Sequence, residues 1–380
     1  MKANRVIISG GGTGGHVFPA LAIADALKKL DPQTEILFVG ANGRMEMEKV
    51  PAAGYQIIGL DIQGFQRKSL FKNLLLPIKI ISSLLKARSI IKDFKPDAAV
   101  GVGGYASGPL LYAAGQMNIP YLIQEQNSYA GITNKWLGKK ARKICVAYKG
   151  MEKFFPANRI MLTGNPIRTE SVAIEGKRED AFSYFNLNPA KKTILVTGGS
   201  LGARTLNNCM LTGMGNIAAS DIQLIWQTGK YYYKTILEQT EDKLNVNIKI
   251  VEFLNRMDFA YAAADLIISR AGAGTIAELC VIKKPVILVP SPNVAEDHQT
   301  KNAMALALND AAVLISDQDA TTKLADTALN LIRNSDKCLS LSENIGKMSL
   351  LHADEIIASE VIKMMSASLK GNEKGGKHGA

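Results

Sequence analysis

The most constraining feature of the sequence is a glycine-rich loop between a strand pattern and a helical pattern. The run Val6–Ser9 is apolar and mostly β-branched, and five of the six residues from Gly10 to Gly15 are glycine. A helical spacing of apolar residues begins at Val17. Glycine lets the backbone turn sharply and lets another group approach its N–H groups, and a helix that starts there adds its own unpaired N–H groups and positive dipole end. The sequence therefore predicts a strand–loop–helix unit that seats an anionic group.

Two other interpretations of this loop stay open. Gly10, Gly12 and Gly15 satisfy the G-x-G-x-x-G pattern of dinucleotide-binding folds, which expects a carboxylate at the end of the second strand. The second strand pattern, Ile36–Ala41, has Glu35 only at its beginning. NAD binding is thus disfavoured, and the remaining alternative is a turn with a purely structural role.

Strand and helix patterns alternate along the whole chain. Alternation predicts parallel sheets covered on both faces, and a length of 380 residues favours two such domains. Strands are expected at Val6–Ser9, Glu35–Val39, Gln56–Leu60, Asp97–Val102, Tyr121–Gln124, Lys143–Ala147, Ile160–Thr163, Thr193–Thr197, Gln223–Trp226, Ile248–Val251, Leu266–Ser269, Pro285–Val289 and Ala312–Ile315. We expect an α/β fold of two doubly wound Rossmann-like domains, with ligands beyond the carboxyl ends of the strands.

The chain also suggests where one domain ends and the next begins. The first domain is expected over residues 1–166 together with a C-terminal helix at about 350–366, and the second over residues 167–349. Pro166 restricts the residue before it and marks the hinge. Residues 367–380 show no apolar period, so a disordered tail is expected there.

Two further glycine loops follow strand patterns in the second half, at residues 198–204 and 270–278. Glu278 falls one turn into the helix that opens at the second of them, where its carboxylate could hold both hydroxyls of a diol. The alternative is a carboxylate that serves only the helix dipole. A loop that donates to phosphate beside a diol-binding carboxylate predicts a nucleoside-diphosphate site.

The charge of the chain points to anionic partners. The formal net charge is +11, and residues 66–92 hold seven basic residues, no acidic ones and a cluster of leucines. Pro77, Lys79 and Lys86 interrupt this segment too often for a membrane span. It could lie on an anionic bilayer, or a helix over Ile78–Phe94 could simply pack on the sheet. Nucleic-acid binding is disfavoured, because only 6% of the residues are aromatic and they do not interleave with the basic run.

Several motifs together resemble one family. They are Gly-Gly-Thr-Gly-Gly-His at 11–16, Gly-Gly-Tyr-Ala-Ser-Gly-Pro at 103–109, Glu-Gln-Asn at 125–127, Ala-Gly-Ile-Thr-Asn-Lys at 130–135, Gly-Asn-Pro-Ile-Arg at 164–168, Gly-Gly-Ser-Leu-Gly-Ala at 198–203 and Arg-Ala-Gly-Ala-Gly-Thr-Ile-Ala-Glu at 270–278. In this order, over about residues 5 to 365, the chain resembles the MurG family of N-acetylglucosaminyltransferases, which convert lipid I to lipid II in peptidoglycan synthesis. The resemblance implies a GT-B fold whose two domains face a cleft, inversion at the anomeric carbon, no cofactor, and no metal bound through a D-x-D triplet.

The resemblance also implies roles for individual residues. Thr13, Gly14 and Gly15 would line the acceptor side of the cleft and touch the donor, while Asn127 and Arg168 would contact donor groups. The remaining donor contacts would come from Ser200 at the diphosphate, the Leu254 backbone at uracil, Ala273, Gly274, Thr275, Ile276, Ala277 and Glu278 at phosphate and ribose, and Gln299 at the N-acetylglucosamine hydroxyls. The chain departs from the commonest family pattern at Gln124, often His, and at Ala271, often Ser.

The reaction requires a general base and stabilisation of the leaving group. The C4 hydroxyl of the acceptor attacks C1 of UDP-N-acetylglucosamine and must lose its proton, while UDP leaves with growing negative charge. His16 and Glu125 are both candidates for the base: an imidazole accepts a proton near neutral pH, and His16 could instead cap the turn or hold phosphate.

The partners implied are UDP-N-acetylglucosamine, lipid I, an anionic membrane surface contacted through residues 66–92, and proteins of cell-wall synthesis or division. The implied location is peripheral, on the cytoplasmic face of the inner membrane. Other GT-B enzymes that use a UDP-sugar, such as a diacylglycerol glycosyltransferase or a UDP-N-acetylglucosamine 2-epimerase, are the alternatives. The motifs around Tyr105 and Asn127 argue against both.

Overall fold

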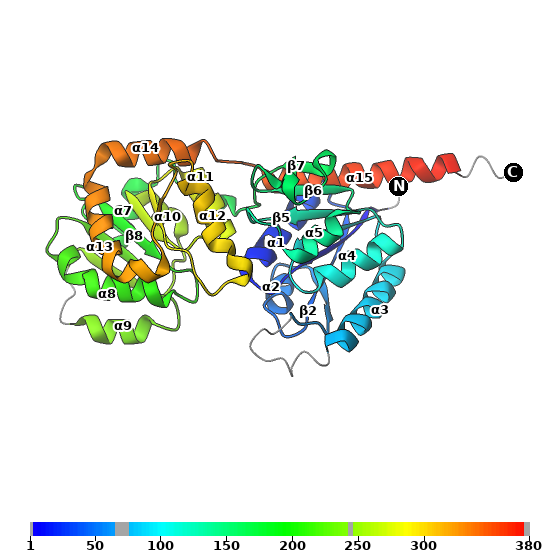
Figure 1. Cartoon of the computed structure of the whole chain (residues 1–380), viewed down its shortest axis with the longest axis horizontal. Helices are drawn as coiled ribbons and strands as arrows, with labels where there is room; N and C mark the ends of the chain where they lie inside the picture. The colour runs from blue at the N-terminus through cyan, green and yellow to red at the C-terminus, as the bar shows by residue number, and fades with distance from the viewer. Residues whose placement is uncertain (1–2, 65–75, 242–245, 376–380) are drawn as a thin grey trace. The chain divides into compact units, whose positions relative to one another are not determined.

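The computed structural model describes residues 3–64, 76–241 and 246–375. The chain forms two compact units, one made of residues 1–167 and 351–380 and the other of residues 168–350. Each unit contains its own parallel β-sheet (Figure 1).

The first unit has a seven-stranded parallel sheet in the order β3-β2-β1-β4-β5-β6-β7. Its strands are β1 (Arg5–Gly10), β2 (Glu35–Ala41), β3 (Gln56–Leu60), β4 (Ala98–Gly103), β5 (Tyr121–Glu125), β6 (Lys143–Val146) and β7 (Ile160–Leu162). Its helices are α1 (Gly14–Leu30), α2 (Glu46–Ala52), α3 (Leu76–Phe94), α4 (Ser107–Gln116), α5 (Ile132–Gly138) and α15 (Ala353–Gly375), with 3-10 turns at Met151–Lys153 and Ala157–Arg159. The strand order reverses direction between β1 and β4, and this switch point is where open α/β sheets bind ligands.

Side chains of β1 show how this sheet is covered on both faces. Val6, Ile7 and Ile8 are all fully buried, and because successive strand side chains point to opposite faces, they belong to two different cores. Ile7 packs in a core with residues of α3, α4 and α5. Val6 and Ile8 pack in a second core with residues of α1 and α15. The C-terminal helix is therefore part of the first unit.

The second unit has a six-stranded parallel sheet in the order β10-β9-β8-β11-β12-β13. Its strands are β8 (Thr193–Thr197), β9 (Gln223–Gln227), β10 (Ile248–Val251), β11 (Leu266–Ser269), β12 (Val286–Leu288) and β13 (Val313–Leu314). Its helices are α6 (Thr169–Val172), α7 (Arg178–Phe185), α8 (Arg204–Ala218), α9 (Tyr233–Thr240), α10 (Met257–Ala263), α11 (Ala273–Ile282), α12 (His298–Ala307), α13 (Asp317–Arg333) and α14 (Ser335–Gly346), with a 3-10 turn at Ala295–Asp297. Helices α8 and α13 pack together on one face (Figure 1).

The core of the second unit includes Trp226 of β9, which is fully buried. Its indole Nε1 donates a hydrogen bond to Asn207 Oδ1 of α8 at 3.0 Å, which satisfies the polar end of the ring. Asn207 in turn donates from Nδ2 to the Thr228 carbonyl at 2.9 Å. This chain of bonds ties α8 to the loop that follows β9.

Within the described residues, each strand expected from the sequence is present as a parallel strand close to its expected position. The C-terminal end is different: α15 continues past the expected end near residue 366 to Gly375. The expected disorder is therefore wrong for residues 367–375, and residues 376–380 lie outside the described part of the chain.

The basic segment 66–92 is described only from Leu76 onward, so residues 66–75 of that prediction lie outside the described residues. From Leu76 the chain forms α3, close to the helix expected at Ile78–Phe94. Within the three described ranges, we find no helix with the length and apolar character required to cross a bilayer.

Candidate active site

The glycine loop after β1 packs directly on the loop after β4. The Gly11 N–H donates to the Gly103 carbonyl at 3.2 Å, and a Cβ at Gly104 would lie only 2.4 Å from the Gly11 carbonyl oxygen. Gly12, Gly103 and Gly104 all have positive φ, of 85°, 107° and 92°, a conformation that favours glycine. These glycines bring two backbone segments together at the carboxyl ends of β1 and β4, the switch point of the sheet.

His16 lies in the first turn of α1 beside this loop and is half-buried. Its Nδ1 is 3.0 Å from the Gly11 carbonyl oxygen and 3.4 Å from Thr13 Oγ1. A carbonyl only accepts hydrogen bonds, so the Nδ1 must carry the proton, and in the neutral ring Nε2 then carries the lone pair. A Cβ at Gly103 would lie 2.7 Å from Nε2. The loop thus holds an imidazole whose Nε2 faces Gly103, where any side chain would collide with the ring.

The other predicted residues of this loop offer backbone groups. Thr13 is the exposed N-cap of α1, and its carbonyl accepts from the N–H groups of His16 and Val17 at 3.0 and 3.1 Å. Gly14 and Gly15 form the first turn of that helix. Their N–H groups are among those that an α-helix leaves without an intrahelical partner.

A buried carboxylate that sequence reasoning missed, Glu46, supports the same loop. Only 1% of Glu46 is exposed, and its Oε2 accepts from Gly12 N at 2.8 Å while Oε1 accepts from Ala41 N at 3.0 Å. The dinucleotide pattern expects an acidic residue at the end of the second strand, whereas Glu46 opens the helix after it. Because both oxygens bind backbone and the group is buried, Glu46 fixes the loop and is not placed to bind a ribose.

Glu125 ends β5, and only 2% of it is exposed. Its Oε1 accepts from the backbone N–H and from Nδ2 of Asn127, at 3.1 and 3.3 Å. Its Oε2 accepts from Gly131 N at 3.2 Å and from Asn134 Nδ2 at 2.9 Å. Four donors therefore occupy this carboxylate, and it holds Asn127 and the following loop in place.

The first glycine loop of the second unit, between β8 and α8, exposes Ser200. Gly199 and Gly202 have φ of 81° and 82°. A Cβ at Gly202 would lie 2.0 Å from the Thr228 carbonyl oxygen, so the loop packs against the segment after β9 at backbone distance. This close approach sets the position of Ser200 at the carboxyl end of β8.

The loop between β11 and α11 places the residues from Ala273 to Glu278 in the first turns of that helix, with Gly272 as the N-cap. Ile276 is only 3% exposed, so it can offer a ligand little besides its backbone. Ala273, Gly274, Thr275 and Ala277 are partly exposed. The helix N-terminus provides N–H groups and a positive dipole end suited to phosphate.

Glu278 is recessed beside a tyrosine that sequence reasoning missed. The hydroxyl of Tyr261, a fully buried residue of α10, donates to Glu278 Oε2 at 2.9 Å. Burial raises the pKa of the Glu278 carboxyl, and the Tyr261 hydrogen bond and the nearby Arg168 guanidinium oppose that rise. The exposed Arg168 is the N-cap of α6. The structure thus brings Arg168, Tyr261 and Glu278 together within the second unit.

Gln299 is held by backbone on both sides. Its Oε1 accepts from Ala271 N at 3.2 Å and from Ser291 N at 2.8 Å, so it joins the loops after β11 and β12. Because Ala271 contributes only its N–H to this contact and is fully buried, alanine at the family's frequent serine position removes nothing from it.

Leu254, expected at uracil, follows β10 and is 7% exposed. It lines a hollow of about 470 Å³ together with Phe253, Asn255 and Arg256. The hollow belongs wholly to the second unit.

The triplet Asp317-Gln318-Asp319 has D-x-D spacing. Asp317 accepts from Arg270 Nη1 at 2.5 Å and from Thr205 Oγ1 at 3.0 Å. Asp319 accepts from Ser316 Oγ at 2.9 Å and lies 3.3 Å from Lys323 Nζ. These contacts assign the two carboxylates to anchoring α13.

Comparison with known proteins matches both halves of the chain. Residues 6–146 match the glycosyltransferase family 28 N-terminal domain and residues 193–356 the family 28 C-terminal domain. The chain is 58% identical over 368 residues to the UDP-N-acetylglucosamine--N-acetylmuramyl-(pentapeptide) pyrophosphoryl-undecaprenol N-acetylglucosamine transferase of Bacteroides fragilis, with 96% of this chain and 97% of the relative covered. It is 55% identical over 365 residues to the enzyme of the same name from Parabacteroides distasonis, with 96% and 99% covered.

Solved structures agree with this match. The crystal structure of Acinetobacter baumannii MurG is similar with a TM-score of 0.78 and 29% identity, covering 95% of this chain and 99% of the other. A Neisseria meningitidis UDP-GlcNAc 2-epimerase has a TM-score of 0.64 at 15% identity over 95% of this chain and all of the other, which shows a shared fold alone. With two Rossmann-like units and full-length relatives above half identity, the chain belongs to the MurG family of GT-B glycosyltransferases within glycosyltransferase family 28.

Proposed function

We propose that this chain transfers N-acetylglucosamine from UDP-N-acetylglucosamine to the C4 hydroxyl of the N-acetylmuramoyl-pentapeptide of undecaprenyl-diphosphate-linked lipid I, giving lipid II. The observation that carries the proposal is the 58% identity, over nearly the full length of both chains, to the Bacteroides fragilis relative whose name states this transfer. The 2-epimerases share the fold at far lower identity, so a transferase is favoured over an epimerase.

In this proposal, the second unit binds the donor. Ser200 and the N–H groups at the start of α11 meet the diphosphate, and one Glu278 oxygen meets the ribose while Tyr261 holds the other. The side-chain oxygen of Gln299 accepts from two backbone N–H groups, and its amide Nε2 would donate to a sugar hydroxyl. The Leu254 backbone contacts uracil, and Arg168 and Asn127 contact further donor groups.

We assign the general base to His16. Its Nδ1 is bonded to a backbone carbonyl, which leaves the lone pair on Nε2 in the neutral ring. Glu125 was an equal candidate from sequence, but its two oxygens already accept from four donors. We therefore give Glu125 a positioning role for Asn127, and Thr13, Gly14 and Gly15 the backbone contacts beside His16.

The test is an assay of the purified chain with radiolabelled UDP-N-acetylglucosamine and lipid I, read as lipid II formed. His16→Gln should lower kcat by about 100-fold or more, the range for loss of a general base, with the dissociation constant of UDP little changed. A matched comparison is Glu278→Ala, which should raise the donor KM most. Conversion of the donor to an epimeric UDP-sugar without acceptor would contradict the transferase assignment.

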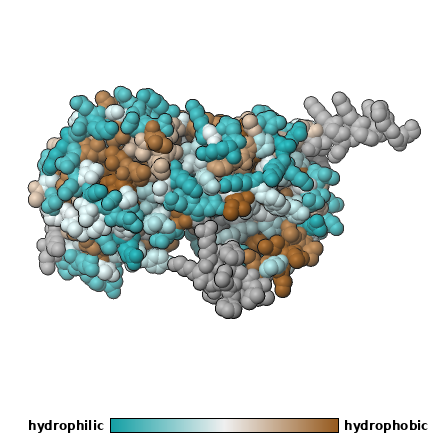
Figure 2. Space-filling view, in the orientation of Figure 1, coloured by the Kyte–Doolittle hydropathy of each residue, from teal (hydrophilic) through white to brown (hydrophobic). Residues whose placement is uncertain are grey.

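We further propose that the chain works as a peripheral enzyme on an anionic membrane surface, through an exposed face of α3. Ile78, Ile81 and Leu85 are 64%, 60% and 60% exposed and lie on one stripe of the helix. Figure 2 shows the hydrophobic surface over α3. The exposed cations Lys86 and Arg88 lie on the same helix. Apolar side chains flanked by cations suit an interfacial helix.

The double variant Ile81→Glu/Leu85→Glu should lose most binding to phosphatidylglycerol vesicles in a flotation assay. The matched control is Leu308→Glu/Leu339→Glu, which introduces the same charges at leucines of the second unit that are 79% and 61% exposed. Equal vesicle binding by the two variants would contradict the proposed role of α3.

A further inference from the structure

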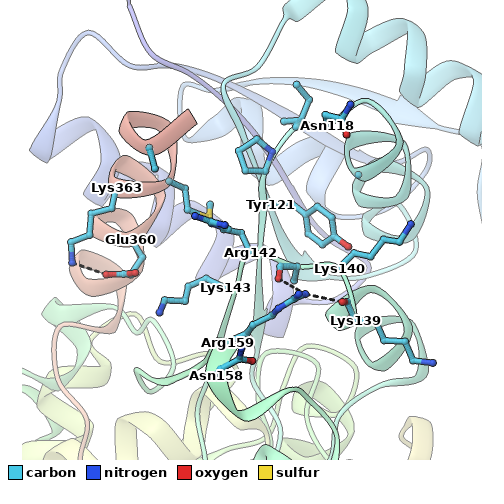
Figure 3. A pocket seen from close by; sticks show the side chains of 16 residues that line it. Asn118, Tyr121, Lys139, Lys140, Arg142, Lys143, Asn158, Arg159, Glu360 and Lys363 are labelled. Atoms are coloured by element: carbon cyan, nitrogen blue, oxygen red, sulfur yellow. Dashed lines mark hydrogen bonds and ion pairs between the residues drawn. The ribbon is translucent and has the colours of Figure 1, made fainter. Parts of the chain in front are cut away.

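A cavity of the first unit lies at the edge of its sheet opposite the glycine loops. Its volume is about 1050 Å³. Tyr121 opens β5 and Lys143 opens β6, while Arg159 directly precedes β7, so the cavity lies at the amino ends of these strands (Figure 3). The glycine loops follow carboxyl ends, and the proposed reaction uses none of the residues of this cavity.

The cavity is lined by cations from separate parts of the chain. These are Lys139, Lys140, Arg142, Lys143, Arg159 and Lys363. Its one carboxylate, Glu360, accepts from Lys363 at 2.6 Å. In the part of the chain that the structure describes, no ion pair joins Lys139, Lys140, Arg142 or Lys143 to a carboxylate.

A run of basic residues such as 139–143 is by itself ordinary solvated surface. Here, however, the fold adds Arg159 from the segment before β7 and Lys363 from α15. Figure 3 shows Arg142 and Lys143 between α15 on one side and the Lys139–Lys140 turn on the other. Gathering like charges around one cavity raises the free energy of the unliganded protein, and a bound anion would lower it.

One of these cations is held rigidly. Arg159 Nη1 donates to the carbonyls of Lys139 and Ala141 at 2.7 and 3.0 Å. These bonds fix the plane of the guanidinium, and its Nε and Nη2 remain as donors with fixed directions, the arrangement that suits two oxygens of one phosphate. Asn118 and Asn158 add amide groups to the lining of the cavity.

We infer that this cavity is a binding site for a multiply charged phosphate group, held by the Arg159 guanidinium and the surrounding lysines and Arg142. Such a group could come from a soluble phosphorylated compound or from a phospholipid headgroup. A smaller hollow of about 210 Å³, lined by Leu111, Tyr112 and Trp136 among others, shares Lys139 and Lys140 with the cavity. If the phosphate belongs to a phospholipid, this hollow could hold part of its acyl chain.

The experiment uses the full chain with saturating UDP, so that the proposed donor site is occupied. Binding of inorganic tripolyphosphate is measured by calorimetry, and binding to vesicles of phosphatidylglycerol with phosphatidylcholine is measured by flotation against phosphatidylcholine alone. The test variant is Lys140→Gln/Arg142→Gln/Lys143→Gln, which leaves the Arg159 bonds intact. The matched control, Lys234→Gln/Lys337→Gln/Lys347→Gln, removes the same charge at exposed positions of the second unit.

The test variant should lose affinity by about tenfold or more, as expected for removing charge-assisted hydrogen bonds, while the control and the UDP affinity of both stay near wild type. Loss of tripolyphosphate binding identifies a soluble ligand, and loss of vesicle binding alone identifies a headgroup. The inference is overturned if neither binding changes in the test variant, or if the control loses as much. Equal melting temperatures of the two variants show that folding is not the cause.

Discussion

At the scale of single residues, the contact between Tyr261 and Glu278 links a buried core to a proposed ligand contact. The tyrosine is fully buried, and its hydroxyl is committed to Oε2 of the glutamate. A carboxylate restrained at one oxygen presents the other in a fixed direction, which lowers the entropic cost of binding a diol. The same hydrogen bond stabilises the charged form of Glu278 against burial.

We predict that Tyr261→Phe raises the donor KM by about 3- to 10-fold, which corresponds to the ~0.5–1.5 kcal/mol that a typical intramolecular hydrogen bond contributes, with kcat nearly unchanged. Without this bond the pKa of the Glu278 carboxyl should rise further. As the pH is lowered, the variant should therefore lose donor binding at a higher pH than the wild-type protein does. Both effects are measured from donor KM across a pH series.

Two features of this test separate positioning from a general loss of stability. The preference of the enzyme for UDP over 2′-deoxy-UDP should shrink in Tyr261→Phe, because the diol contact is the one weakened. The matched control is Tyr121→Phe, which removes another buried tyrosine bond, to the Leu137 carbonyl at 2.7 Å in the first unit. If both variants change the donor KM alike, Tyr261 has no special role.

Residues such as Tyr261 and Glu46 were not predictable from the sequence for a shared reason. Each forms a hydrogen bond to a residue distant from it in the sequence, Glu46 to Gly12 and Tyr261 to Glu278. Neither belongs to a glycine motif, and their contacts exist only once helices pack on the sheet. His16 could be singled out because it ends the motif itself, but its proton position follows from the Gly11 carbonyl, which only the folded loop brings near.

At the scale of secondary-structure elements, the strands were predictable because buried parallel strands are short apolar runs with turn residues at both ends. The run Val6–Ser9 followed by glycines is typical. The end of α15 was not predictable in this way. Beyond residue 366 no apolar periodicity remains to mark a buried helix face, although α15 extends to Gly375.

Within the loop between β8 and α8, one glycine packs at backbone distance against the segment after β9. Gly202 has φ of 82°, and a Cβ there would meet the Thr228 carbonyl oxygen at 2.0 Å. We predict that Gly202→Ala lowers the free energy of unfolding by at least about 1 kcal/mol through backbone strain and weakens UDP binding. Chemical denaturation and calorimetry measure the two effects.

The control for this loop is Gly215→Ala in helix α8, where an added Cβ meets nothing within 4 Å. There alanine should leave UDP binding intact and raise stability by up to about 1 kcal/mol, because glycine is a poor helix former. UDP affinity that is unchanged in Gly202→Ala would show that the β8–α8 loop does not bind the diphosphate.

At the scale of the whole molecule, the two units have separate hydrophobic cores, so a nucleotide that binds one unit should stabilise that unit. UDP at 100 times its dissociation constant should stabilise the unit that binds it by about 2.7 kcal/mol. Hydrogen exchange should slow at residues 198–204 and 270–278 of the second unit, and Glu278→Ala should need more UDP for the same protection. Protection confined to residues 10–16, with none at 270–278, would contradict the assignment of the donor to the second unit.

The return of α15 to the first unit makes the second unit an insertion within the first, since the chain passes from one to the other near residue 167 and back near residue 351. A protein engineer who exchanges sugar-nucleotide preference between related enzymes should therefore transplant residues 168–350 as an internal cassette. Grafting everything after residue 167 would replace Ile357, Ala358 and Val361, which fill the core around β1, and would leave the recipient with a foreign helix against its own sheet.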